Sequence, residues 1–290
     1  MVQIMKLMDY HSHNRRCGHA RGEIEDYVKI AIEKNLKEIG ITDHFPLGAI
    51  IDDPQFIKII KRASMEVEEF PHYIKEIRSL KEKYKNKINI RISTEINFAT
   101  PGRPLTRQKK ILEPFMDDFD YLLGAIHDIK WHESPIIIID PREGSEALKK
   151  YGVEKINLEY INKLTKLVDT NFFDAIAHFD NQRVLMRQNN PNYSQNAWQK
   201  LLDLLDKIKN KGMAVEINTS GILKDIGSQF PSDEIIKEII ERDIPLMLGS
   251  DAHRPEYIGY LFKEISEKIK KWGLSHLCAY EKREQRLIKI

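Results

Sequence analysis

The chain has 290 residues, of which 41% are hydrophobic and 31% charged, so it can bury one substantial core, which excludes a disordered or fibrous protein. Its 46 Lys and Arg nearly balance its 44 Asp and Glu, and the net charge of +2 gives no reason to expect nucleic acid or a membrane surface as a partner. The two cysteines, Cys17 and Cys278, exclude a disulfide framework and indicate a reducing compartment, so we expect a cytoplasmic protein.

Short apolar runs alternate with longer amphipathic segments, a pattern that is typical of βα units around a parallel sheet. The runs rich in Val, Ile or Leu predict seven strands, over 3–9, 38–43, 88–96, 121–126, 174–177, 213–218 and 245–250. Apolar residues at helical spacing predict helices over 22–36, 66–84, 157–169, 197–211, 233–242 and 256–272. Residues 45–53 and 130–151 are expected to be loops long enough to cover a site.

Seven strands with helices outside them predict a barrel that forms one domain of residues 1–290. An open doubly wound sheet is the alternative architecture. No Gly-rich phosphate loop follows the first strand, so the sequence does not support a nucleotide-binding version of that sheet.

Most histidines of the chain stand at the ends of the predicted strands, together with two acids. The set is His11, His13, His19, His44, Glu95, His127, His178, Asp251 and His253. Because the carboxyl ends of barrel strands meet at one edge, these side chains are expected to converge. Nine donors exceed the three or four that one zinc ion uses, and imidazole mixed with carboxylate suits zinc, iron or manganese. The pattern therefore predicts more than one metal ion.

A structural role is the alternative for any single histidine at a strand end, and it is our interpretation of His72, His132 and His276, which lie outside the pattern. For the set as a whole that alternative fails. Burying seven imidazoles and two acids without metal would leave costly unsatisfied polar groups.

The motifs that carry these residues follow one another along nearly the whole chain. They are His11-Ser12-His13, Cys17-Gly18-His19-Ala20, Thr42-Asp43-His44, Glu95, Ala125-Ile126-His127, Ala177-His178-Phe179-Asp180 and Gly249-Ser250-Asp251-Ala252-His253. In this order they resemble the motifs of the polymerase and histidinol phosphatase (PHP) family. The resemblance implies an α/β fold of the PHP type, a distorted seven-stranded, TIM-like (β/α)7 barrel with three divalent metal ions.

The resemblance also implies which residues hold each metal. The first ion would be held by His11, His13, Glu95 and Asp251, the second by Glu95, His127 and His178, and the third by His19, His44 and His253. The Cys-Gly-His-Ala element and the chain length are similar to the branch of the family that hydrolyses L-histidinol phosphate in histidine biosynthesis. We therefore expect a metal-activated hydroxide to attack a small phosphate monoester.

Further residues are candidates for catalysis and phosphate binding. Arg183 matches a family position that binds phosphate, whereas Arg16 and Arg142 could reach a phosphate or be surface arginines. Asp43 could protonate the leaving alkoxide or accept a hydrogen bond from a ligand imidazole. We reject Cys17 as a nucleophile, because no thiolate-activating pair is evident beyond histidines already assigned to metal.

The pocket for the ammonium and imidazole of histidinol should offer acids or aromatic rings. Asp52, Asp53, Glu143 and Asp180 are the acidic candidates in the neighbouring loops. The side chain of Asn218 would either point into the same open end of the barrel or cap a turn.

Two other functions stay open at this stage. The same centre could serve another phosphoester, a nucleotide or a phosphotyrosine, or the chain could be a noncatalytic metal-binding module. The second is disfavoured because such modules often lack some ligands, whereas all nine are present.

Overall fold

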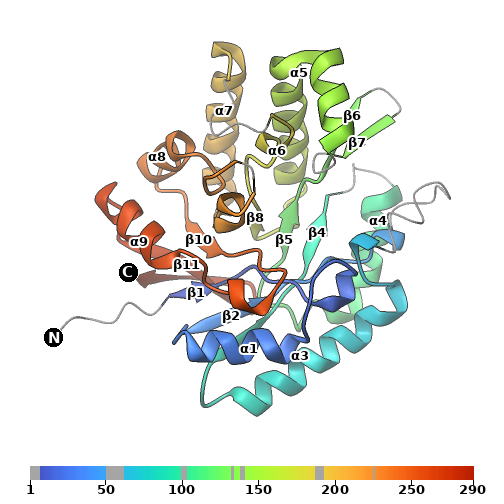
Figure 1. Cartoon of the computed structure of the whole chain (residues 1–290), viewed down its shortest axis with the longest axis vertical. Coiled ribbons are helices and arrows are strands. Elements are labelled where there is room, and N and C mark those ends of the chain that lie inside the picture. Colours follow the sequence, from blue (N-terminus) through green and yellow to red (C-terminus); the bar gives the residue numbers. More distant parts are fainter. Residues whose placement is uncertain are drawn as a thin grey trace.

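The structure, a computed structural model, describes residues 7–49, 62–98, 103–131, 134–137, 141–186, 193–224 and 226–290. Within the helices and strands, the side chains of 103–104, 130–131, 134–137 and 141–143 lie outside the description. The fold is α/β: strands occupy the centre and helices surround them (Figure 1).

Eight strands form two parallel sheets. The first has the order β1-β2-β3 and consists of Met8–Asp9, Glu38–Ile41 and Asn89–Ile92. The second has the order β10-β9-β8-β5-β4 and consists of Leu246–Gly249, Ala214–Asn218, Ala175–Ile176, Leu123–Ala125 and Glu95–Asn97. Each predicted run contains at least one of these strands. The run 88–96 contributes to both sheets, because β3 ends the first sheet and β4 begins the second.

Backbone contacts join the two sheets at both margins. His44 forms an isolated parallel bridge with Glu95, and Ser12 forms one with Ala252. The amide of Tyr10 donates to the carbonyl of Leu248 at 2.9 Å. The strands that begin and end the predicted series are therefore neighbours in space.

The helices lie where apolar residues recur at helical spacing. They are α1 (Ile24–Glu33), α3 (Phe70–Tyr84), α4 (Arg103–Leu112), α5 (Pro141–Asp169), α6 (Arg183–Met186), α7 (Gln195–Lys211), α8 (Asp233–Glu241) and α9 (Phe262–Lys271). In α9 the residues Phe262, Ile265 and Ile269 are buried and the lysines face outward. None of the described helices is long and apolar enough to span a bilayer.

The strands are buried on both faces, as expected of parallel strands with helices packed against them. Strands β2, β5, β9 and β10 have no exposed residue. A single hydrophobic cluster runs from Leu7 to Tyr280. This packing holds the strands rigidly, so the residues at their carboxyl ends have fixed positions.

The segment 130–151 was wrongly predicted as a loop. Its first part belongs to an antiparallel hairpin of β6 (Asp128–Trp131) and β7 (Ser134–Ile137). Helix α5 begins at Pro141 and continues past a break at Gly152, where φ is 77°. Lys163 in this helix donates to Asp128 Oδ2 at 2.7 Å and ties it to the hairpin.

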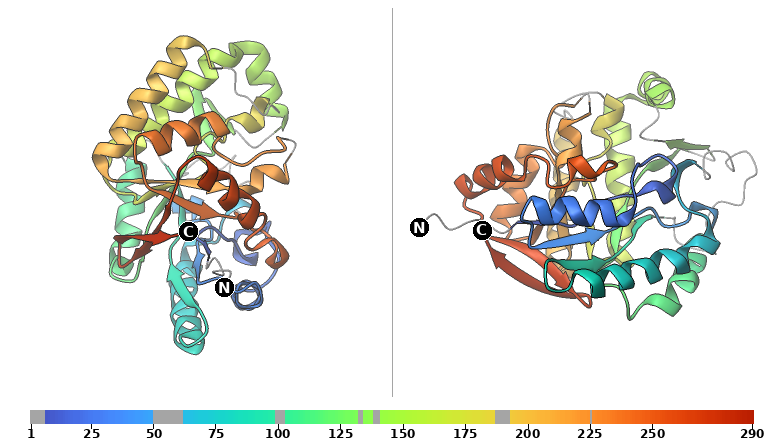
Figure 2. Two further views of the ribbon diagram at one scale, coloured as in Figure 1. Left: turned by 90° about the vertical axis from the view of Figure 1, so that its left-hand side faces the viewer. Right: turned by 60° about the horizontal axis from the view of Figure 1, so that its bottom comes forward.

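A second hairpin, β11 (His276–Glu281) with β12 (Glu284–Lys289), was not predicted. It packs at the C-terminus against the rest of the fold (Figure 2). Arg286 of this hairpin donates to Glu38 Oε1 at 3.2 Å, and Arg283 donates to Asp174 Oδ2 at 2.9 Å. Because Glu38 begins β2 and Asp174 precedes β8, the hairpin covers the amino ends of the strands.

Candidate metal centre

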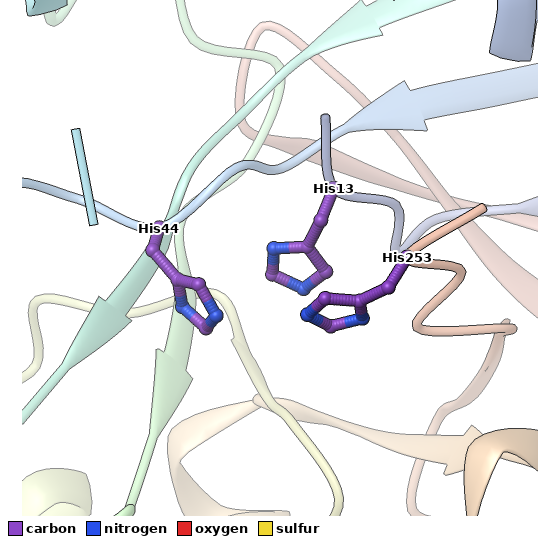
Figure 3. Close-up of side chains that lie close together, drawn as sticks. All are labelled: His13, His44 and His253. Atoms are coloured by element: carbon purple, nitrogen blue, oxygen red, sulfur yellow. The ribbon is translucent and has the colours of Figure 1, made fainter. Parts of the chain in front are cut away.

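The carboxyl ends of the strands bring the nine predicted ligands into one cluster. His11 and His13 follow β1, His44 follows β2, and Glu95 begins β4. Among the described residues, side-chain groups able to hold a metal ion include His11/His13/Glu95, Glu95/His127/His178 and His13/His44/His253. The imidazoles of the last group, from three distant segments, face a common space (Figure 3).

The residues expected around the first ion surround one point. The Nε2 atoms of His11 and His13 lie 3.0 Å apart, and Glu95 Oε2 lies 3.5 Å from the first and 3.6 Å from the second. Asp251 Oδ1 lies 3.0 Å from His13 Nε2 and 3.7 Å from His11 Nε2. All four side chains are buried.

The residues expected around the second ion share the other oxygen of Glu95. Glu95 Oε1 lies 2.8 Å from His178 Nε2 and 3.4 Å from His127 Nε2. The carboxylate thus has one oxygen directed at each predicted metal position, as a bridging ligand would.

The grouping around the third expected ion is less compact. His19 Nε2 and His253 Nε2 lie 2.9 Å apart, but the ring centroid of His44 is 5.2 Å from that of His19 and 6.1 Å from that of His253. His44 Nδ1 instead lies 2.8 Å from Glu95 Oε2. Three-residue groups in this region also include Cys17/His19/His253.

The electrostatics of the cluster fit a cation. Burial, the largest influence, acts to raise the pKa of Glu95, but the charges of His44 and His127 outweigh it and hold that pKa well below 4.5. Burial and the charge of His13 lower the pKa of His44 to about 4 and that of His253 well below 6.5. Burial, the largest influence, acts to lower the pKa of His11 and His13, but the neighbouring acids outweigh it and raise the first well above 6.5 and the second to about 9. A metal ion needs unprotonated imidazoles, so its binding at these two residues would displace protons.

Glu216, in β9, contacts two of the predicted ligand residues, His11 and His178, and was missed by the sequence analysis. Its Oε1 lies 2.7 Å from His11 Nδ1, and its Oε2 accepts the backbone amide of His178 at 2.7 Å and the side chain of Asn218 at 2.9 Å. A carboxylate on the outer nitrogen orients an imidazole so that its other nitrogen faces a metal. The sequence feature that could have identified Glu216 is the position of an acidic residue inside an apolar run that is predicted to form a buried strand.

Two of the predicted ligands have left-handed backbones. The φ angle is 27° for His178 and 52° for Asp251. Such conformations cost of the order of 1–3 kcal/mol each and are concentrated at functional sites. The bond from the His178 amide to Glu216 stabilises one of them.

Arg183, which is predicted to bind phosphate, has partners inside the protein. The Arg183 guanidinium is fully buried, with Nε 2.9 Å from Asp180 Oδ2, and it donates to the Ser228 hydroxyl at 3.1 Å and to the Gln229 carbonyl at 2.5 Å. The side chain is therefore enclosed by the protein, and its role in phosphate binding stays a prediction.

The other two arginine candidates have different outcomes. Arg16 donates to Glu76 Oε2 of α3 at 2.5 Å, and its Nε lies 3.6 Å from Glu69 Oε2. The side chain of Arg142 lies outside the described residues.

Asp43 and Cys17 both lie beside the histidines. Asp43 Oδ1 accepts the amide of His44 at 2.9 Å and lies 3.4 Å from His13 Nδ1, an arrangement that favours a role in holding that imidazole. The thiol of Cys17 is buried and donates to the Asn14 carbonyl at 3.2 Å. Burial raises the pKa of Cys17, which disfavours a nucleophilic thiolate.

Of the acids considered for the histidinol amine, only the side chain of Asp180 is among the described residues. Asp180 is paired with Arg183, whereas Asp52, Asp53 and the side chain of Glu143 lie outside the described residues. Asn218 caps the following turn, where its Oδ1 accepts the amide of Ser220 at 3.0 Å.

Comparison with known proteins identifies the family. A family model described as the PHP domain matches residues 9–220. The chain belongs to the PHP family. Its match to that family extends over the segment that supplies every predicted ligand except Asp251 and His253.

Relatives that match along nearly their whole length are also found. The chain is 28% identical over 269 residues to a Deinococcus radiodurans protein named "Probable histidinol-phosphatase", covering 92% of this chain and 94% of that protein. It is 24% identical over 273 residues to the histidinol-phosphatase of Bacillus subtilis, covering 91% and 100%.

A solved structure has a similar fold. The crystal structure of histidinol phosphate phosphatase from Lactococcus lactis, complexed with zinc, L-histidinol and phosphate, aligns with a TM-score of 0.72 and 22% identity over 97% of this chain and 99% of that one. This likeness supports the α/β fold with parallel sheets.

Proposed function

We propose that the protein is a metal-dependent phosphomonoesterase that hydrolyses L-histidinol phosphate to L-histidinol and phosphate. The observation that carries the proposal is the convergence of histidines and acids on Glu95, whose two oxygens face different imidazole groups. The histidinol-phosphatase names of relatives that match along nearly their whole length support the choice of substrate.

The proposal includes three divalent ions, zinc, iron or manganese, with the ligand sets given by the family resemblance. The first and second sets are supported by the groups around Glu95. The third is supported by the close approach of His19 and His253, with His44 as the neighbouring imidazole.

The residues of the chain prepare the site for that chemistry. Divalent ions bound there would activate a water molecule as the nucleophile and neutralise the phosphoryl oxygens. Glu216 orients His11, and Asp43 lies where it can orient His13. The ionised state of Glu95 and Asp251 supplies the negative charge that retains cations.

The architecture proposed with this function is one domain in which the two parallel sheets close into a distorted seven-stranded barrel, with β3 and β4 counted as the one strand predicted over 88–96. The bond from Tyr10 to Leu248 and the bridge between His44 and Glu95 support closure at the two margins. The continuous hydrophobic cluster supports a single domain.

Phosphate release from L-histidinol phosphate tests the proposal. We expect activity that is lost on chelation and restored by zinc, iron or manganese. A nucleoside monophosphate and phosphotyrosine serve as competing substrates, and a clear preference for either would overturn the choice of substrate. Absence of phosphatase activity from a fully metal-loaded protein would favour the noncatalytic alternative.

A further inference from the structure

A phosphate monoester needs positive groups beyond the metal ions, because charge spreads over its phosphoryl oxygens during transfer. The arginines expected to serve this purpose are paired elsewhere: Arg183 is buried against Asp180, and Arg16 pairs with Glu76. Both arginines thus already have an acidic partner among the described residues.

Lys224 lies at the edge of the cluster. Its Nζ is 3.6 Å from Asp251 Oδ2, and among the described Lys and Arg residues it alone lies within 4.0 Å of Glu95 or Asp251. It follows the short helical turn Thr219–Ile222 that comes directly after β9. The backbone thus brings an ammonium group to the same edge as the predicted ligands.

The two oxygens of Asp251 face different partners. Oδ1 is the atom near His13 and His11, at 3.0 and 3.7 Å. Oδ2 accepts the hydroxyl of Ser220 at 2.9 Å and faces Lys224. The carboxylate of Asp251 therefore separates the Lys224 ammonium from the first predicted metal position.

No hydrogen bond from the Lys224 ammonium is found among the described residues. The 3.6 Å separation from Asp251 is longer than a hydrogen bond, and the Lys224 side chain is 39% exposed, whereas that of Asp251 is 8% exposed. Its ammonium lies 5.5 Å from the centroid of the Phe230 ring, which meets the His178 ring at a centroid distance of 6.5 Å. Phe230 thus lies near both the Lys224 ammonium and one of the predicted ligands, His178.

We propose that Lys224 binds the phosphoryl group of the substrate at the metal centre. This inference rests on the proposed phosphomonoesterase function and adds a substrate contact to it. An ammonium at the solvent edge of a centre for cations would meet an incoming phosphate oxygen before the metals do.

The test compares four metal-loaded proteins: the unchanged chain, Lys224→Ala, Lys224→Arg and Lys237→Ala. Lys237 is the matched control, because its ammonium also lies over an aromatic ring, 5.3 Å from the Trp272 centroid, but in α8. Inorganic phosphate binding is measured by titration calorimetry, and bound metal by elemental analysis. KM and kcat for L-histidinol phosphate are measured on the same samples.

Lys224→Ala should weaken phosphate binding about tenfold to a hundredfold at unchanged metal content, as expected for loss of a charge-assisted hydrogen bond. Lys224→Arg should retain most of the affinity, and Lys237→Ala should retain all of it. Unchanged phosphate affinity in Lys224→Ala would overturn the proposal. So would a loss of metal with normal phosphate affinity at the remaining loaded sites, because Lys224 would then act only through Asp251.

Failure of the proposed function gives a different result. A chain that binds phosphate through Lys224 but releases none from L-histidinol phosphate would support this inference and contradict the choice of substrate. An unchanged chain that binds no phosphate when fully loaded would overturn the role of Lys224 directly.

Discussion

Glu95 is the residue through which the two best-defined groups of ligands meet, because Oε2 faces His11 and His13 while Oε1 faces His178. Glu95→Gln keeps the size of the side chain but removes its charge. We expect turnover to fall by orders of magnitude, since the shared negative charge between two cations is lost. Initial rates of phosphate release and the free energy of unfolding of the metal-free protein are the measurements, and the second should change little.

His276→Ala provides the control for Glu95→Gln. His276 begins β11, on the hairpin at the opposite end of the strands, and is exposed. Its removal should leave turnover unchanged. Equal losses in the two variants would contradict the assignment of Glu95 to the metal centre.

A second prediction at the scale of the residue concerns the stability of a variant at Arg183. Its guanidinium is the buried partner of Asp180, and burial, the largest influence, raises the pKa of that acid above 3.8. Arg183→Met leaves the acid buried without its ion pair. The free energy of unfolding should therefore fall by about 3–5 kcal/mol, as measured by denaturant titration.

The double variant Arg183→Met with Asp180→Leu separates this effect from simple loss of packing. It should recover part of the lost stability, because no unpaired charge remains. A stable Arg183→Met protein with weakened phosphate binding would instead support the role in binding that the family resemblance implied.

The convergence of the histidines and acids could be predicted from the sequence because their chemistry is unusual at strand ends: a histidine beyond an apolar run is noticeable without a structure. The roles of Arg183 and Lys224 could not. An arginine near a ligand motif and a lysine in a turn have ordinary sequence contexts, and only the packing shows which cation is enclosed and which faces solvent.

At the scale of the element, Gly249 of β10 allows Glu216 of β9 and His11 to approach its backbone closely. A Cβ at this position would lie 1.8 Å from Glu216 Oε1 and 2.6 Å from His11 Cβ. Gly249→Ala should therefore displace Glu216 or the strand. Metal affinity should fall about tenfold to a hundredfold, as for the loss of other groups that orient ligands, and metal titration checks this.

Glu216→Gln is the companion variant for that prediction, because it weakens the contact with His11 without adding volume. Both variants should lose metal affinity, and only Gly249→Ala should also lose stability through overpacking. Normal metal binding in Gly249→Ala would show that β10 moves without disturbing the ligands.

The elements were predictable where burial dictates the pattern. Continuous apolar runs mark strands that are covered on both faces, and each predicted run contains a strand. The β11–β12 hairpin escaped prediction because β12 is exposed or half-exposed throughout and carries little apolar signal. Helix α5 was predicted only over its second part, since Pro141, Gly144 and Gly152 interrupt the pattern before it.

At the scale of the whole molecule, the two ends of the strands have separate roles. At the amino ends, Glu38 accepts from Arg91 at 2.6 Å and from Tyr10 at 2.7 Å under the terminal hairpin. At the carboxyl ends stand the histidines. Contacts such as that of Asp9 with the Ser250 amide, at 2.9 Å across 241 positions, cannot be predicted from local pattern, because they depend on how the sheets come together.

Metal removal tests this arrangement as a unit. Without cations the cluster holds nitrogen atoms 2.9–3.0 Å apart and ionised acids that burial disfavours, so binding of metal should stabilise the folded state. At a free metal concentration about a thousand times Kd, the gain is about 4 kcal/mol, which corresponds to a rise in Tm of roughly 8–16 °C for a chain of this order of size. Thermal unfolding followed by circular dichroism, before chelation, after it and after repletion, measures the change. His276→Ala should show the same shift as the unchanged chain. A Tm that does not respond to metal, or fewer than two tightly held ions per chain by elemental analysis, would contradict a multinuclear centre.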